Sequence, residues 1–321
     1  MNAQITVIIP TYNRPDCISY LLENSLNQYQ GELFAFQIHD SSDDEKTKEL
    51  LKPYLSERVQ YFRYPASING DVKTMLAIDG TESEFVYLLG DGLSVDFNAL
   101  EQFLLKSDFH QVLVIGFRDF RGIAKKYIDA EVGAPVYEDD VVAYFQKYFW
   151  MLTLYGSTIV KGDVLKKAFQ LSERYQKMKS PFMYVCSLFE ALFREQGVNL
   201  FAFVDFVEVN PHKKQSGWFG ERRAVEFFCY RYYASVLLLP KEYGASEREF
   251  LTMHNRCSQL FSFKGILRLR QSGNLTLRMV RDYRFYMKET VSNMTPVYLS
   301  LLIPRFVLTW GKSLYHVVKK R

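Results

Sequence analysis

The sequence of 321 residues lacks the patterns by which cysteine usually builds a metal site or a disulfide framework. Its four cysteines lie far apart and form neither a CxxC pair nor a Cys/His pair, which argues against structural zinc and against disulfides. The N-terminus has no basic start, long apolar segment or small-residue cleavage site of the kind found in signal peptides. We therefore expect a cytoplasmic protein with reduced cysteines.

Two glycine-rich nucleotide signatures are also missing. Neither GxGxxG after a predicted strand nor a GxxxxGK[ST] loop occurs, so a dinucleotide redox cofactor and a P-loop phosphate site lack their fingerprints. A membrane-spanning helix is not expected either. The uncharged stretch Thr290–Pro304 has 15 residues, and a span needs roughly 20.

The composition is that of an ordinary globular protein, with 48% apolar and 24% charged residues. The charge, however, is unevenly distributed. Residues 1–263 carry 28 Lys or Arg and 34 Asp or Glu, whereas residues 264–321 carry 12 Lys or Arg and two Asp or Glu. An acidic body with a basic, aromatic tail points to an anionic surface as a partner of the tail.

Strands and helices alternate in the first part of the chain. The run Ile5–Ile9 is apolar and β-branched, as in a strand covered on both faces, and Pro15 stands where a helix would begin. The same pattern predicts strands at 36–39, 59–63, 84–89 and 111–117 and helices at 44–51 and 98–106. This alternation indicates an α/β fold with a mainly parallel, twisted, Rossmann-like sheet and flanking helices.

The alternation weakens beyond about residue 120. Residues 137–155 and 181–195 are predicted to be helices, and the sequence after residue 221 is mostly helical with no convincing strand. We place a soft boundary near residue 210. The predicted organisation is one α/β domain over residues 1–210 and a helical, basic and aromatic region over residues 211–321.

Three polar segments follow predicted strands, and in open parallel sheets ligands bind beyond the strands' carboxyl ends. They are Thr11–Arg14, Asp40–Ser42 and Gly90–Gly92. Asp91 lies between two glycines, so little side-chain bulk is expected to shield its carboxylate. That setting suits Mg²⁺ or Mn²⁺ held by a carboxylate and substrate phosphates. The alternative is a tight turn in which Asp91 only caps a helix.

Taken together, four segments in order resemble the successive motifs of family 2 glycosyltransferases with the GT-A fold. The resemblance covers about residues 4–97. The segments are Val7–Pro15, Ile38–Asp44, Asn69–Gly70 and Glu84–Asp91.

The resemblance implies a nucleotide-sugar donor, with a UDP-sugar favoured, and transfer by a single inverting displacement. The implied roles are a base and ribose site near Thr11, Tyr12, Arg14 and Asp40, a donor-site loop with Lys73 as a phosphate contact, and a divalent metal on Asp91. The full set of expected donor-binding residues is Pro10, Thr11, Tyr12, Arg14, Asp40, Ser42, Asn69, Gly70, Lys73, Gly90 and Asp91.

The sequence departs from the family pattern at the metal motif and at the catalytic base. Gly92 follows Asp91 where further aspartates are common in the family, and His212 is a candidate additional metal ligand, with a solvated loop as the alternative. Where the family usually has an acidic pair, residues 182–187 contain no carboxylate. Glu190 is the nearest candidate base, followed by Asp119 and Asp205, and a catalytically silent nucleotide-binding or scaffold protein is the alternative function.

The C-terminal region alternates arginines with large apolar residues. Two interpretations remain open: a helical cap on the α/β domain, or a surface that lies peripherally on the anionic inner face of the cell membrane. With the family resemblance, the second suggests a saccharide or lipid-linked saccharide acceptor in surface-polysaccharide assembly. No nucleic-acid motif accompanies the basic residues, so nucleic acid is not an expected partner.

Overall fold

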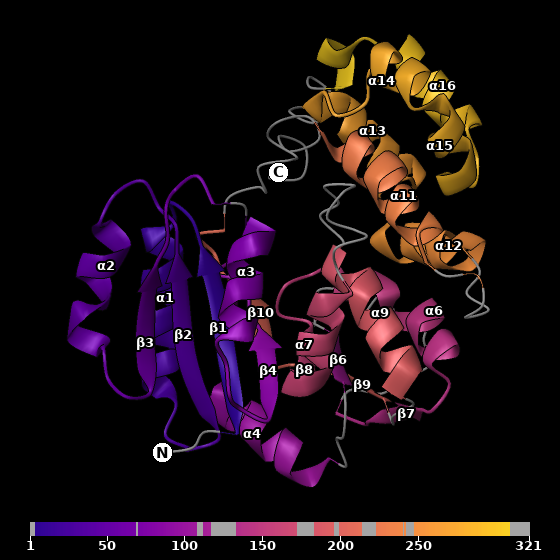
Figure 1. Cartoon of the computed structure of the whole chain (residues 1–321). Helices are drawn as coiled ribbons and strands as arrows, with labels where there is room; N and C mark the ends of the chain where they lie inside the picture. The colour runs from indigo at the N-terminus through magenta and orange to yellow at the C-terminus, as the bar shows by residue number, and fades with distance from the viewer. Residues whose placement is uncertain are drawn as a thin grey trace. The chain divides into compact units, whose positions relative to one another are not determined.

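The computed structural model describes residues 4–68, 70–107, 112–116, 133–171, 183–195, 199–213, 223–239, 241 and 247–308. The chain folds into two compact units (Figure 1). The first comprises Met1–Arg174 and Met183–Lys214, and the second comprises Tyr175–Phe182 and Gln215–Arg321.

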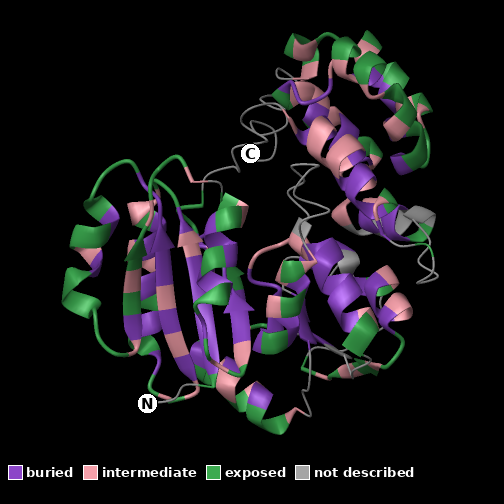
Figure 2. Cartoon of the chain, viewed as in Figure 1, coloured by how far each residue is buried: buried purple, intermediate pink, exposed green. Residues whose placement is uncertain are grey.

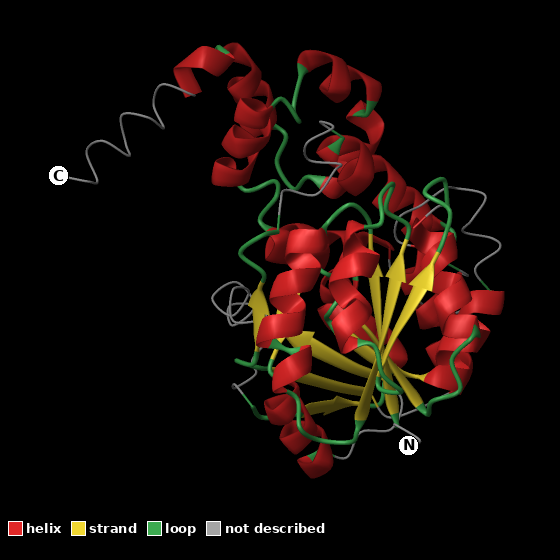
Figure 3. Ribbon diagram, turned by 90° about the vertical axis from the view of Figure 1, so that its left-hand side faces the viewer, coloured by secondary structure: helices red, strands yellow, loops and turns green. Residues whose placement is uncertain are grey.

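An eight-stranded sheet of order β3-β2-β1-β4-β8-β6-β9-β7 forms the centre of the first unit. Its parallel part begins with four adjacent strands: β3 (Val59–Arg63), β2 (Phe34–Asp40), β1 (Ile5–Thr11) and β4 (Phe85–Leu88). In β1 all positions but Pro10 are buried, because helices cover both faces of the sheet. Figure 3 shows the strands between these helices, and the predicted α/β fold is confirmed.

The other half of the sheet differs from the sequence prediction. After residue 120 only helices were predicted, yet β7 (Val136–Glu138), β8 (Thr158–Lys161) and β9 (Asn199–Phe203) are strands. β8 pairs antiparallel with β4 and with β6 (Val112–Gly116), while β6 and β9 are parallel. Strands of three to five residues are too short to show a period, so the sequence pattern missed them.

Helices of the first unit follow the strands closely. Four of them begin within two residues of a predicted position, and the helices over 70–79 and 162–170 were not predicted. The predicted helix at 137–155 is shorter, because its first residues belong to β7. The bounds are α1 (Pro15–Asn24), α2 (Lys46–Leu51), α3 (Gly70–Asp79), α4 (Phe97–Lys106), α6 (Val141–Leu152), α7 (Gly162–Gln170) and α9 (Met183–Glu195).

A separate two-stranded sheet joins distant parts of the first unit. β5 (Leu93–Val95), directly after the Gly90–Gly92 turn, pairs antiparallel with β10 (Val207–Val209). The segment that follows residue 209 is thereby brought next to the turn that follows β4.

The second unit is helical in the residues that the structure describes. Its core contains Cys229, Ile266, Leu269, Val280 and Met287, among others. None of the helices described in the chain is long and apolar enough to cross a membrane. The bounds are a π-helix (Glu226–Arg231), α11 (Tyr232–Leu237), α12 (Glu247–Ser258), α13 (Phe263–Ser272), α14 (Leu277–Asp282), α15 (Arg284–Thr290) and α16 (Thr295–Leu302).

An aromatic cluster under β1 and β2 anchors α4 to the sheet. Phe97, the first residue of α4, is 1% exposed. Its ring centroid lies 5.1 Å from that of Phe34 and 4.8 Å from that of Phe36, both in edge-on geometry. Figure 2 shows how burial concentrates along these strands.

We expect Phe97→Ala to lower the free energy of unfolding by about 3–5 kcal/mol, because the cavity left among Phe34 and Phe36 cannot collapse fully. Denaturant unfolding followed by circular dichroism would measure it. Leu105→Ala is the control, since Leu105 lies on the same helix and is 67% exposed. Equal losses for the two variants would contradict the packing described here.

Candidate active site

The carboxyl ends of β1, β2 and β4 meet at one edge of the sheet. Thr11 at the end of β1 pairs in register with Asp40 at the end of β2, and Ile8 pairs with Leu88 of β4. Asp91 comes three residues after Leu88. The three polar segments that the sequence placed at a crevice therefore gather at this edge, as parallel strands require.

Asp91 is buried and paired rather than open. The residue is 4% exposed. Its Oδ2 accepts a hydrogen bond of 2.8 Å from the Thr11 hydroxyl, and its Oδ1 forms an ion pair with Arg14 Nη1 at 2.8 Å. The two flanking glycines do not leave the carboxylate unshielded, because Arg14 and Thr11 cover it. A buried carboxylate needs such a partner, since leaving its charge uncompensated is costly.

A second cation, Lys73 of α3, points into the same edge. Lys73 is 2% exposed, and its Nζ donates to the Thr11 carbonyl at 2.7 Å and to Ser41 Oγ at 2.9 Å. Burial lowers the pKa of Lys73 to about 8, against the opposing effect of Asp40 and Asp91. The predicted phosphate contact therefore lies beside Thr11, with its amine already held by backbone and hydroxyl oxygens.

Asp40 is completely buried and accepts hydrogen bonds at both oxygens. Oδ1 accepts from the backbone N–H of Ser42 at 2.7 Å and from the Ser42 hydroxyl, while Oδ2 accepts from Tyr61 at 2.9 Å and from Arg63 Nη1 at 2.8 Å. A ligand that reached this carboxylate would have to replace one of these donors. The expected ribose or base contact of Asp40 thus remains a prediction.

Sequence reasoning missed Tyr61 and Arg63. Both lie on β3, which runs parallel to β2 and ends at the same edge, with Arg63 in register with Asp40. The predicted strand at 59–63 could have indicated both residues, because the last residues of a parallel strand lie at the same edge of the sheet as the crevice. The Arg63 side chain is 29% exposed, so it lies between the buried Asp40 and solvent.

The loop between β1 and α1 is tied to the loop after β2. Asn13 has a positive φ of 52°, and its backbone N–H donates to Ser42 Oγ at 2.8 Å. The Asn13 amide and the Tyr12 hydroxyl both donate to Asp43, at 2.6 and 3.2 Å. Tyr12 remains 48% exposed, so its ring is accessible at the mouth of the site.

Three further expected donor residues flank this edge. Pro10 lies in β1 and is partly exposed, and Gly70 opens α3 at the surface. Gly90 faces Tyr155 so closely that a Cβ added to it would lie 3.2 Å from the Cβ of Tyr155. Asn69 lies outside the described residues.

The segment with His212 is attached to the Asp91 turn. Asn210 follows β10, and its side-chain amide donates to the Asp91 carbonyl at 3.2 Å and to the Cys17 carbonyl at 3.0 Å. The His212 backbone N–H donates to Asn210 Oδ1 at 2.9 Å, and the His212 ring is exposed, 5.8 Å from the ring of Tyr20. The structure therefore brings the segment with His212 next to the Asp91 turn, and the role of His212 as a metal ligand stays a prediction.

The candidate bases are less well placed. Glu190 of α9 is 1% exposed and lies 3.7 Å from Arg194 of the same helix. Asp205 is exposed in the turn between β9 and β10, and Asp119 lies outside the described residues.

One protein family matches the part of the chain that forms this edge of the sheet. Residues 6–134 match the family described as Glycosyl transferase family 2. These residues contain β1 to β4 with the Asp91 turn, so the match covers the strands that build the candidate site and supports a glycosyltransferase. Comparison with curated protein sequences gave no match.

Solved structures are similar in fold. A fragment of S. aureus TarS, residues 1–349, is 14% identical, with a TM-score of 0.55 over 93% of this chain and 90% of that one. A longer S. aureus TarS chain gives a TM-score of 0.51 at 14% identity, and the match covers 93% of this chain and 55% of that one. Glucosyl-3-phosphoglycerate synthase from Mycobacterium tuberculosis is 13% identical, with a TM-score of 0.45 over 76% and 81% of the two chains.

We expect Asp40→Asn to reduce the free energy of unfolding by roughly 2–3 kcal/mol, because it removes a buried charge on which Tyr61 and Arg63 depend. Chemical denaturation at pH 7.5 would measure the loss. Asp44→Asn is the matched control, since Asp44 is exposed near the same loop and pairs only with Lys46 among the ion pairs described. A loss for Asp40→Asn as small as the control's would contradict the structural role.

Proposed function

We propose that the chain is an inverting glycosyltransferase whose nucleotide-sugar donor lies across the ends of β1, β2 and β4. The observation that best supports this proposal is the buried Asp91 carboxylate, which lies between Thr11 and Arg14 with Lys73 nearby. A site that places two cations and a carboxylate at the carboxyl edge of a parallel sheet suits a polyanionic ligand with a bound cation.

The diphosphate of the donor is assigned to the cationic side of this cluster. Arg14 has a side chain that is 34% exposed, so its guanidinium is reachable while one nitrogen contacts Asp91. Lys213 packs its stem over Gly92, where an added Cβ would lie 2.8 Å from its Cδ. Partial burial and the nearby Arg14 lower the pKa of Lys213. A phosphate group relieves repulsion between these two cations.

A divalent cation, Mg²⁺ or Mn²⁺, fits this site only when the donor is bound at the same time. The described residues contain no group of three His, Cys, Asp or Glu that would hold a metal. Asp91 offers one carboxylate, and Arg14 already supplies a positive charge at its Oδ1. Asp91, with His212 on the attached segment, would hold an ion whose other ligands are phosphate oxygens. Such an ion neutralises charge that develops on the leaving diphosphate.

The nucleoside is assigned to the mouth formed by Tyr12 and Arg63. The exposed Tyr12 ring offers a stacking surface, and Arg63 lies between Asp40 and solvent. Asp40 then acts by orienting Arg63 and Tyr61, or contacts the base directly once they move. A UDP-sugar remains the favoured donor.

We expect Asp91→Asn to abolish the stabilisation by donor and Mn²⁺ and to reduce turnover at least 100-fold, because the amide loses the charge that holds a cation. A thermal-shift panel of UDP-, GDP-, CMP- and dTDP-sugars with and without Mn²⁺ measures binding, and nucleotide release measures turnover. Asp16→Asn, at an exposed position of α1 close in sequence to Arg14, is the control. Full activity of Asp91→Asn in excess chelator would refute the metal assignment.

The acceptor is proposed to be a saccharide, with a lipid-linked saccharide at an anionic membrane surface as the specific form. The support comes from the second unit alone. Residues 264–308 carry eight Lys or Arg and two Asp or Glu, and this part of the chain exposes both basic and large apolar side chains. The most exposed large apolar side chains of residues 263–308 are Phe263, Leu277, Phe285, Leu299, Leu302 and Phe306, at 55–79%.

Such a surface suits an anionic leaflet, because apolar side chains enter the interface while arginines contact lipid phosphates. The Arg278 and Arg281 side chains are 84% and 76% exposed, so they are available for such contacts. Figure 2 shows the exposed positions along α14 and α16.

We expect the protein to co-float with vesicles that contain phosphatidylglycerol and to lose this binding in Leu302→Glu/Phe306→Glu, which places charge on the apolar positions. Vesicles of phosphatidylcholine alone and vesicles at high salt should bind weakly, because counterions screen the arginines. Leu105→Glu, at an exposed leucine of the first unit, is the control. Binding that is unchanged in the double variant would contradict this surface.

A catalytically silent nucleotide-binding protein is the second candidate function. The observation in its favour is that Glu190 is buried and that no carboxylate stands at residues 182–187. Turnover of any nucleotide sugar by the purified protein would exclude it, and Glu190→Gln tests whether that residue takes part.

A further inference from the structure

Both carboxylate oxygens of Asp91 already have a partner in this structure. The Thr11 hydroxyl donates to Oδ2 and the Arg14 guanidinium donates to Oδ1, each at 2.8 Å. Asp91 is buried, so charges close to its carboxylate interact strongly. A divalent cation bound at Oδ1 would lie against the positive charge of Arg14, and two cations at one buried oxygen repel each other. Arg14 and a divalent cation therefore compete for the same oxygen.

Arg14 is the partner of Asp91 that can leave. Its side chain is 34% exposed, whereas Thr11 is buried in β1 and pairs in register with Asp40 of β2. Arg14 directly precedes α1 and reaches Asp91 with Nη1. Among the residues that the structure describes, Asp91 is the one acid with which Arg14 forms an ion pair. A rotation of the Arg14 side chain toward solvent would therefore break this ion pair and leave the strands unchanged.

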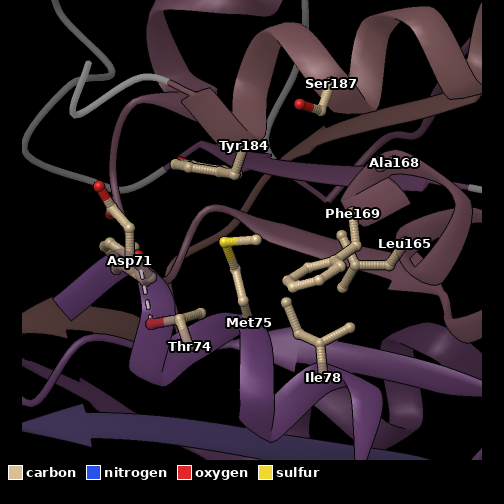
Figure 4. Close-up of a pocket in the computed structure, with 10 residues that line it drawn as sticks. Asp71, Thr74, Met75, Ile78, Leu165, Ala168, Phe169, Tyr184 and Ser187 are labelled. Atoms are coloured by element: carbon tan, nitrogen blue, oxygen red, sulfur yellow. Dashed lines mark hydrogen bonds between the residues drawn. The ribbon is translucent and has the colours of Figure 1, made fainter. Parts of the chain in front are cut away.

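Lys73, the other cation at this edge, is fixed in place. Its Nζ donates to the Thr11 carbonyl, and the residue is buried. The helix that carries Lys73 is also held on another side, because Met75 and Ile78 of α3 line a mainly apolar pocket together with residues of α7 and α9 (Figure 4). Lys73 cannot follow a ligand, so Arg14 is the positive charge that can move.

A diphosphate offers Arg14 a second anionic partner. Lys213, whose stem packs over Gly92 beside Asp91, lies within electrostatic reach of Arg14. A phosphate group near both cations relieves their repulsion. A guanidinium can also bind two phosphate oxygens at once. The arrangement therefore favours a contact of Arg14 with the donor once a diphosphate is present.

We propose that Arg14 controls when the divalent cation binds: it pairs with Asp91 in the free protein and moves to the diphosphate of the donor, which leaves Asp91 Oδ1 for the cation. The proposal rests on the glycosyltransferase function proposed above, and it names Arg14 as the residue that makes cation binding depend on the donor. Free Mg²⁺ or Mn²⁺ meets a neutralised carboxylate, so it binds weakly. Donor and cation bind cooperatively, and the coupling is the same in either direction.

A different use of Arg14 predicts a different outcome. If Arg14 kept its contact with Asp91 and bound phosphate with its remaining N–H groups, it would still repel a cation at Oδ1 while the donor is bound. The donor would then raise cation affinity no more in the wild type than in a variant without Arg14. Measurements of cation binding distinguish the two arrangements without any transfer reaction.

Equilibrium dialysis against Mn²⁺ alone tests the competition directly. We expect Arg14→Gln to bind Mn²⁺ about tenfold more tightly than the wild type, because the amide leaves the Asp91 charge uncompensated and couplings between sites are typically about 5–150-fold. Lys52→Gln is the matched control, since it removes one positive charge from an exposed position of the same unit, where Lys52 pairs with Glu49. This control should bind Mn²⁺ within about twofold of the wild type, because exposed charges contribute little.

The double variant Arg14→Gln/Asp91→Asn locates the site that Arg14→Gln opens. It should lose the tighter Mn²⁺ binding, because the buried carboxylate that attracts the cation is gone. Tight binding that persists in the double variant would place the new site elsewhere and overturn the proposal. An affinity of Arg14→Gln for Mn²⁺ equal to that of the wild type would overturn it as well.

The donor dependence is measured with UDP in both compartments of the same dialysis, so that Mn²⁺ held by free UDP is equal on the two sides. The gain in Mn²⁺ affinity from UDP should be at least about fivefold larger for the wild type than for Arg14→Gln. Phosphate oxygens attract the metal in both proteins, but only in the wild type does UDP also release Asp91 from Arg14. Equal gains in the two proteins would contradict the proposal.

Thermal stability provides an independent readout. Arg14→Gln should have a lower Tm than the wild type, because a buried carboxylate loses its partner, and Mn²⁺ alone should raise the Tm of this variant more than that of the wild type. If Arg14→Gln fails to fold, a wild-type Mn²⁺ affinity that is no higher with UDP than without it overturns the proposal. Failure of the wild type to bind UDP or any nucleotide sugar would instead contradict the proposed function, and the dialysis against Mn²⁺ alone would still decide whether Arg14 competes with the cation.

Discussion

The ion pair between Arg14 and Asp91 is the interaction on which the rest of the site depends. Asp91 is 4% exposed, so its charge would be prohibitively costly without a partner. Arg14 precedes α1 and Asp91 follows β4, so the pair fastens the first loop of the chain to a turn that lies 77 residues away. Thr11 and Asn210 then have fixed positions against the same turn. The loops at the mouth of the crevice are therefore held in place by contacts to Asp91, whose charge Arg14 neutralises.

The sequence was sufficient to predict this edge of the sheet, because parallel strands impose it. Once Ile5–Ile9 is a buried strand that leads to a helix, the end of β1 must lie beside the ends of β2 and β4. The sequence was not sufficient, however, to predict that Arg14 and Thr11 cover Asp91. Glycines beside a carboxylate indicate little local bulk, but they say nothing of side chains that arrive from another strand.

Short antiparallel strands were missed for a related reason. β8 has four residues, and its identity comes from pairing with β4 and β6 rather than from its own pattern. The local sequence pattern indicates which secondary structure a residue prefers, but the strand partners it gains in the fold depend on distant parts of the chain.

Charge balance links donor and cation at this site. In the protein alone Arg14 neutralises Asp91. A diphosphate that draws Arg14 toward itself leaves Asp91 with an uncompensated charge in a buried position, and a divalent cation between carboxylate and phosphates restores the balance. Under the proposed function, donor and cation would therefore assist each other's binding, because each alone meets a site in which Arg14 already neutralises Asp91. In the proposed complex a single carboxylate would suffice, because the remaining ligands and the remaining charge would both arrive with the donor.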